Sequence, residues 1–100
     1  MKKIVLICAA GMSTSLLVNK MKEAAVKENV ECDINAYPVA EASKVIPEAD
    51  CVLLGPQVRY ELQRLKKEYP ATPIEAIDMT AYGMMDGATV LKQALLLVKD

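Results

Sequence analysis

The stretch CAAGMSTS, residues 8–15, is the part of this sequence best suited to chemistry. A cysteine ends an apolar segment, and seven uncharged, mostly small residues separate it from the next apolar segment. A short loop that leads into a helix directs several backbone N–H groups at one point, and with the helix dipole these groups bind anions. A thiolate is itself an anion, so the same loop would favour the reactive form of Cys8. We predict that Cys8 is a catalytic nucleophile, followed by a phosphate-binding loop of Ala9, Ala10, Gly11, Met12, Ser13, Thr14 and Ser15.

The composition excludes several other kinds of chemistry. The chain has no histidine, so it cannot carry a phosphohistidine or use histidine in acid–base catalysis, and most zinc sites are excluded. Its three cysteines are widely spaced and form no CxxC pair, which indicates a reducing cytoplasm. Cys32 and Cys51 fall in predicted strands and are expected to be core residues. We predict neither a metal nor a cofactor.

The length and charge of the chain limit its partners. Its 100 residues, 53% apolar and 25% charged, fit one compact domain over residues 1–100. A net charge of −1 gives no basic surface for nucleic acid. The apolar runs are much shorter than the ~18 residues of a membrane span, so we expect no direct membrane insertion.

The elements that must hold Cys8 in place follow from the hydrophobic pattern. Strands alternate with helices along the chain, which is typical of an α/β protein with a parallel sheet. We expect a serine or threonine to cap the first helix. The predicted strands span residues 2–8, 30–37, 50–56 and 72–79, and the predicted helices span residues 13–29, 40–49, 57–69 and 86–100.

The order of the strands follows from their polarity. The first and third are continuously apolar and should be central, whereas the second alternates in polarity and the fourth opens with Pro73, as edge strands do. The predicted sheet is therefore a single open, four-stranded parallel sheet of order 2-1-3-4, with helices on both faces. Ligands bind beyond the carboxyl ends of the strands where the chain reverses direction. We expect Cys8 at that end, beside residues 55–57 and not buried beneath the helices.

Several other residues near the predicted site have two interpretations. Gln57 and Tyr60 would border the site or contact a partner, or they would only form a turn and a helix start. Met12 would contact a partner or fold inward. Arg59 and Arg64 are the nearest candidates to supply positive charge to the site, although their helical positions better fit a solvated face. For a last group of residues, a structural role in turns and caps fits better than chemistry: Asp78, Tyr82, Gly83, Asp86 and Gly87. The individual roles of Asp78 and Tyr82 stay open.

The loop is similar to the signature of the low-molecular-weight protein tyrosine phosphatases. Those enzymes have a cysteine, five residues, an arginine and then serine or threonine, on a parallel sheet that the predicted fold resembles. Cys8 matches the nucleophile and Ser15 the final hydroxyl, but Thr14 stands where the arginine should be. Because that arginine clamps the phosphoryl group, its absence should slow hydrolysis and let a phosphocysteine persist. An arginine introduced at residue 14 should then speed hydrolysis.

Three stretches together resemble one family. CAAGMSTSLLV (residues 8–18), VLLGPQVRY (52–60) and AIDMTAYGMMDG (76–87) are similar to the enzyme IIB component of the bacterial phosphoenolpyruvate-dependent sugar phosphotransferase system, of the lactose/cellobiose type. The resemblance implies that Cys8 accepts a phosphoryl group from a phosphohistidine of enzyme IIA. It further implies transfer to a cellobiose-, lactose- or chitobiose-like sugar bound by the membrane component IIC, which would bring a cytoplasmic protein to the membrane.

Two alternative functions stay open. The first is a phosphatase-like hydrolase that uses the Cys8 loop, and the missing arginine argues against it. The second is an anion-binding module without catalysis, and a cysteine where alanine would suffice argues against it. The sequence does not specify the sugar, the oligomeric state, or the cognate IIA and IIC.

Overall fold

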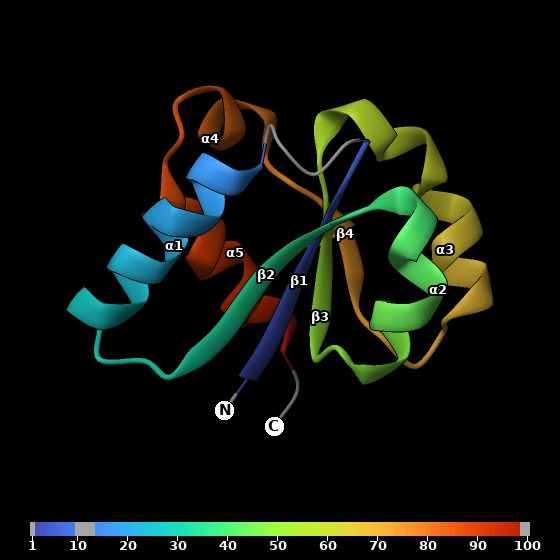
Figure 1. Ribbon diagram of the computed structural model, residues 1–100, viewed down its shortest axis with the longest axis horizontal. Helices are drawn as coiled ribbons and strands as arrows, with labels where there is room; N and C mark the ends of the chain where they lie inside the picture. Colours follow the sequence, from blue (N-terminus) through green and yellow to red (C-terminus); the bar gives the residue numbers. More distant parts are fainter. Residues whose placement is uncertain (1, 10–13, 99–100) are drawn as a thin grey trace.

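The computed structural model describes residues 2–9 and 14–98 (Figure 1). The strands are β1 (Lys2–Cys8), β2 (Cys32–Pro38), β3 (Cys51–Leu54) and β4 (Ile74–Ala76). The helices are α1 (Ser15–Lys27), α2 (Ala42–Val45), α3 (Leu62–Glu68), α4 (Met79–Gly83) and α5 (Gly87–Leu97). Three 3₁₀ turns complete the chain order: η1 (Val39–Glu41) and η2 (Ile46–Glu48) flank α2, and η3 (Pro56–Glu61) precedes α3.

The four strands form one parallel sheet in the order β2-β1-β3-β4. Ile4 pairs with Ile34 on one side of β1 and with Cys51 on the other. All of β3 is buried, whereas only Ile34 is buried in β2. Continuous apolarity thus marks the central strands and alternation marks the edge, and the predicted fold and strand order are confirmed.

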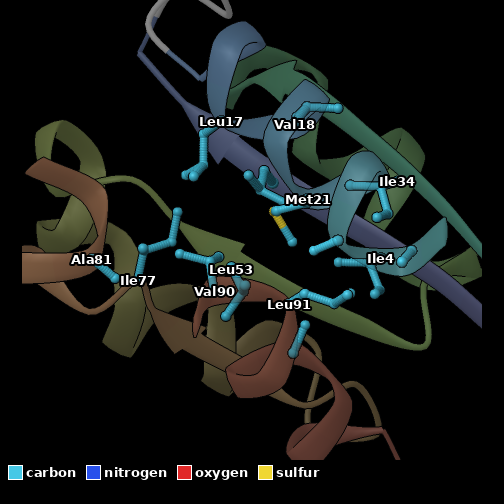
Figure 2. Packing of buried hydrophobic residues seen from close by; sticks show 14 of the residues in the cluster. Ile4, Leu17, Val18, Met21, Ile34, Leu53, Ile77, Ala81, Val90 and Leu91 are labelled. Carbon is cyan, nitrogen blue, oxygen red and sulfur yellow. The ribbon is translucent and has the colours of Figure 1, made fainter. Parts of the chain in front are cut away.

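Each face of the sheet carries its own core, because successive residues of a strand point to opposite faces. Ile4 and Leu6 belong to the core beneath α1 and α5, and Val5 and Ile7 belong to the core beneath α2 and α3. Figure 1 shows α1 and α5 on one side of the sheet and α2 and α3 on the other. Figure 2 shows the first core, where Met21 of α1 lies among side chains of the strands and α5.

Three predicted elements are shorter or less regular than expected. The predicted helix 40–49 is α-helical only over α2 (Ala42–Val45), between the 3₁₀ turns η1 and η2. The predicted helix 57–69 begins as the 3₁₀ turn η3, because Val58 has non-helical backbone angles (φ −119°, ψ 17°). The predicted strand 72–79 pairs only over Ile74–Ala76. Directly after it stands α4, which the sequence analysis did not predict. Asp78 begins α4 as its N-cap, and its carboxylate accepts a hydrogen bond from the Ala81 N–H at 3.0 Å.

No helix in the part of the chain that the structure describes is long and apolar enough to cross a bilayer. The longest, α1, has 13 residues and keeps an exposed polar face.

Candidate functional site

Cys8 is the last residue of the central strand β1, at the carboxyl end of the sheet. The neighbouring strand β3 ends at Leu54, and the N–H of the next residue, Gly55, donates to the carbonyl of Ile7 over 2.8 Å. The chain segments that follow β1 and β3 therefore start side by side. This is the place where the strand order predicts a ligand site.

The sulfur of Cys8 contacts polar groups from different parts of the chain. Thr14 Oγ1 donates a hydrogen bond to Cys8 Sγ over 3.2 Å, and Sγ lies 3.8 Å from the carbonyl oxygen of Tyr37 in β2. The side chains of Cys8 and Thr14 are both 0% exposed. The expectation that Cys8 would not be buried was therefore wrong, since its sulfur lies between Thr14 at the start of α1 and the Tyr37 carbonyl of β2.

Thr14 is the N-cap residue of α1, as the sequence predicted for a serine or threonine, but its side chain makes no cap hydrogen bond. Its backbone lies in the right-handed helical region (φ −97°, ψ −5°), whereas a capping residue is typically extended. The hydroxyl turns to the Cys8 sulfur instead. The residue that the sequence analysis placed in a phosphate-binding loop is thus in direct contact with the predicted nucleophile.

The structure describes only part of the rest of the predicted phosphate-binding loop. Ala10, Gly11, Met12 and Ser13 lie outside the described residues. Ala9 follows Cys8 with an exposed side chain, and Ser15 is exposed at the first position of α1. The structure therefore places Cys8, Thr14 and the start of α1 together, and the loop between them stays a prediction.

Gly55 gives the site a close backbone approach. A Cβ atom at Gly55 would lie 3.3 Å from Gln57 Oε1, 3.5 Å from the Ile7 carbonyl oxygen and 3.7 Å from Cys8 Cβ. The Gln57 amide therefore folds back over Gly55, next to Cys8. Gln57 therefore lies near the end of β1, and its role at the rim of the site stays a prediction.

Tyr82 of α4 joins this rim, which the sequence analysis did not foresee. Gln57 Nε2 donates to Tyr82 Oη over 3.4 Å, although the two residues are 25 positions apart. Tyr60 is 76% exposed on η3. The sequence gives no signal for the Gln57–Tyr82 contact, because it depends on α4, whose only marker is the capping residue Asp78.

The other two cysteines are poorly suited to nucleophilic chemistry. Burial raises the pKa of the Cys32 thiol and raises that of Cys51 to about 12, with a smaller contribution from the nearby Asp50 carboxylate for Cys51. Burial therefore disfavours the thiolate at both positions, and the thiol is a much weaker nucleophile than the thiolate. The three cysteines, all within the described residues, form no disulfide.

The remaining charged candidates have structural roles. Asp78 caps α4, and Asp86 caps α5 by accepting from the Thr89 N–H at 3.2 Å, so both have the structural role that the sequence favoured over chemistry, including Asp78, whose role had stayed open. Arg64 pairs with Glu61 and Glu68 on the exposed side of η3 and α3, as expected for a solvated face.

The chain matches known proteins over almost its full length. The family model for the lactose/cellobiose-specific IIB subunit of the phosphotransferase system matches residues 3–93. A curated relative, the oligo-beta-mannoside-specific EIIB component of Bacillus subtilis, is 47% identical over 98% of this chain and 97% of its own length. The cellobiose-specific EIIB component of Lactococcus lactis is 42% identical over 93% of each chain.

Two further matches concern structure and domain arrangement. The solution structure of the cellobiose-specific phosphotransferase IIB component from Borrelia burgdorferi superimposes with a TM-score of 0.80 at 38% identity, over 97% of this chain and 91% of that one. A lactose-specific EIICB component of Lactococcus lactis is 32% identical over 65% of this chain, which corresponds to 11% of that longer protein. The chain therefore belongs to the lactose/cellobiose-specific IIB subunits of the phosphotransferase system and is a phosphotransferase, a phosphoryl carrier of sugar uptake.

Proposed function

We propose that Cys8 is the phosphoryl-carrying residue of this IIB chain. It would accept a phosphoryl group from a phosphohistidine of enzyme IIA and pass it to a sugar bound by the membrane component IIC. The observation that carries the proposal is the position of the Cys8 sulfur at the carboxyl end of the central strand, with the Thr14 hydroxyl donating to it over 3.2 Å. Cys32 and Cys51 are less suited to this role, because burial raises the pKa of both thiols and disfavours the thiolate.

Phosphate binding would use the residues between Cys8 and α1. We propose Ala9 to Ser15 as the phosphate-binding loop, since it leads into the N-terminus of a 13-residue helix whose dipole favours negative charge. Gln57 borders this site through its position over Gly55, next to Cys8. No cofactor or metal enters the proposed transfer.

A carrier fits these residues better than a phosphatase. The stretch from Cys8 to Ser15 contains no arginine or other cation, and the chain contains no histidine. A phosphoryl group held there would lack the bidentate cation that stabilises the transition state of attack by water. We therefore expect the phosphocysteine to survive in water until a sugar hydroxyl is presented.

The surface around the carboxyl end of the sheet would dock both partners. A phosphoryl group passes only when donor and acceptor meet nearly in line, so the partners must reach Cys8 from that end. The described residues there include large apolar side chains that are more than half exposed, which suits a protein contact: Leu16, Tyr60, Met79 and Met84. The relative in which a similar segment is part of one EIICB chain supports a close association with IIC. Such a partner would bring this chain, as a single cytoplasmic domain, to the membrane.

Replacement of Cys8 tests the proposal. Cys8→Ser keeps a side chain of similar size, but its hydroxyl does not ionise near neutral pH, so sugar phosphorylation with phosphorylated IIA and IIC membranes should be abolished. Cys32→Ser is the matched control, because that cysteine is half-buried in β2 and should be dispensable. Full activity of Cys8→Ser would contradict the proposal.

A further inference from the structure

We infer that Thr14 is a functional residue of the phosphoryl transfer, whose hydroxyl stabilises the Cys8 sulfur as a thiolate. The inference rests on the proposed function of Cys8 and assigns a second residue to it. Its starting point is the 3.2 Å hydrogen bond from Thr14 Oγ1 to Cys8 Sγ. Three further observations separate this bond from an ordinary helix cap.

The first observation is that Thr14 does not cap its own helix. Asp78 and Asp86 occupy the same N-cap position on α4 and α5, and each accepts a hydrogen bond from the N–H three residues later. Thr14 accepts no such bond from α1. Its hydroxyl donates to the sulfur instead, so α1 has no side-chain cap at its N-terminus.

The second observation is burial. Among the described residues, Thr14 is the one fully buried polar residue, at 0% exposure. A buried hydroxyl needs a good hydrogen-bond partner. A thiol sulfur is a weak acceptor, whereas hydrogen bonds to an ionised acceptor are roughly twice as strong as neutral ones. The hydrogen bond from the Thr14 hydroxyl is therefore stronger when Cys8 is a thiolate than when it is a thiol.

The third observation is the second neighbour of the sulfur. The Tyr37 carbonyl oxygen, 3.8 Å from Sγ, can only accept a hydrogen bond, so it suits the thiol and disfavours the thiolate. Thr14 therefore supplies the donor that offsets this carbonyl when the proton leaves. The two contacts together also fix the direction of the Cys8 side chain.

The hydrogen bond bears on both steps of the transfer. When the thiolate attacks, an S–P bond forms, the N–P bond of the donor breaks, and the donor nitrogen keeps the electron pair. When the sugar hydroxyl attacks, an O–P bond forms, the S–P bond breaks, the electron pair returns to sulfur, and the hydroxyl proton passes to solvent. Because the same bond also stabilises the attacking thiolate, its clearest effect is expected on the second step, where sulfur is the leaving group.

Two variants separate the hydroxyl from the shape of the side chain. Thr14→Val removes the hydroxyl and keeps the shape, whereas Thr14→Ser keeps the hydroxyl and loses a methyl group. Each full-length chain is loaded from phosphorylated IIA, freed of donor, and mixed with sugar and IIC membranes. We expect discharge of the phosphoryl group to be about tenfold slower in Thr14→Val, and close to the parent rate in Thr14→Ser.

A second readout does not depend on phosphoryl transfer. Iodoacetamide alkylation of Cys8 at pH 7 is followed by mass spectrometry on the tryptic peptide of residues 4–20, which contains no other cysteine. Thr14→Val should react several-fold more slowly than the parent, and Thr14→Ser should react like the parent. Circular dichroism checks that each variant is folded, and Thr14→Ala replaces Thr14→Val if that variant is not.

The possible outcomes distinguish a failure of the inference about Thr14 from a failure of the function proposed for Cys8. A parent chain that takes no phosphoryl group from IIA refutes the role of Cys8, while the alkylation rates still test the hydrogen bond. A parent that transfers normally, with Thr14→Val as fast as Thr14→Ser in both assays, overturns the inference. Equal slowing of both variants, or failure of both Thr14→Val and Thr14→Ala to fold, would make Thr14 a packing residue and would also overturn it.

Discussion

Thr14 stands where the phosphatase signature has an arginine, and its burial changes what that comparison predicts. From the sequence, Thr14→Arg should supply the missing cation and speed hydrolysis of the phosphocysteine. The structure shows Thr14 at 0% exposure, so a guanidinium would enter a closed site with no carboxylate among the described contacts of Cys8 and Thr14.

We therefore expect Thr14→Arg to destabilise the fold rather than create a phosphatase. An uncompensated buried charge costs about 3–5 kcal/mol. Urea unfolding should show the loss, and Ser15→Arg is the matched control, because Ser15 is the next residue and is exposed. A folded Thr14→Arg variant as stable as Ser15→Arg would show that the site opens easily enough to admit a cation.

At the scale of elements, the contact between α1 and α5 depends on Gly87. A Cβ atom at this first residue of α5 would lie 2.3 Å from the Lys20 carbonyl carbon and 2.6 Å from its oxygen, both in the backbone of α1. Backbone atoms cannot move aside as a flexible side chain does. The two helices would have to separate above the core in which Met21 and Val90 lie (Figure 2).

Gly87→Ala should lower the free energy of unfolding by about 1–3 kcal/mol, as overpacking does in other cores. Gly83→Ala is the control, because a Cβ atom at Gly83 in α4 meets nothing within 4 Å. That variant should be unchanged or more stable by up to about 1 kcal/mol. Equal stability of the two variants in urea unfolding would show that α1 and α5 can separate at little cost.

Because Asp86 caps α5, the protein should become less stable at acid pH. Hydrogen bonds from the Thr89 hydroxyl and N–H hold the pKa of the Asp86 carboxyl below its ordinary value. The folded state therefore prefers the carboxylate, and this stabilisation is complete above the ordinary pKa and is lost as the pH falls through the folded one.

Asp86→Asn keeps an acceptor oxygen but not the charge. The parent should be more stable than this variant at pH 7, and the difference should shrink between about pH 5 and pH 2. Thermal unfolding of both proteins across that range measures it. A difference that stays constant with pH would show that the charge of Asp86 does not contribute.

The hydrophobic pattern predicted the sheet well because it records burial directly. β1 and β3 are apolar at successive positions and covered on both faces, whereas β2 buries only Ile34. The pattern did not predict α4, a helix of five residues that is too short to show a period and is marked only by Asp78. It also did not predict the burial of Cys8, whose sulfur contacts the Thr14 hydroxyl and the Tyr37 carbonyl, because contacts between residues 6 and 29 positions apart cannot be read from a local hydrophobic pattern.

At the scale of the whole molecule, the proposed chemistry lies at the carboxyl ends of the strands, and the start of β1 and the end of α5 lie at the opposite end. Figure 1 shows the start of β1 and the end of α5 away from the carboxyl ends of the strands, while α4 lies near those carboxyl ends. Tyr60 and Leu96 are both large, exposed apolar side chains, on η3 and near the end of α5. Because the two side chains are similar in character but lie at different places on the molecule, replacing each in turn tests where the docking surface lies.

Tyr60→Ala should slow phosphoryl uptake from IIA at low IIA concentration by about tenfold, because it removes an exposed aromatic side chain from the proposed docking surface. Leu96→Ala should leave the rate unchanged. The initial rate of phosphorylation against IIA concentration measures both. A stronger effect of Leu96→Ala than of Tyr60→Ala would place the IIA contact elsewhere.

The most direct test of the central claim is to locate the phosphoryl group. The full-length chain is incubated with phosphorylated IIA, separated from it, and examined by intact mass and by mass spectrometry of the tryptic peptides over time. We predict one phosphoryl group per chain, on the peptide of residues 4–20 at Cys8, that persists in water and is lost on addition of IIC membranes and sugar. A phosphoryl group on any other peptide, or its rapid release as inorganic phosphate without IIC, would contradict the account.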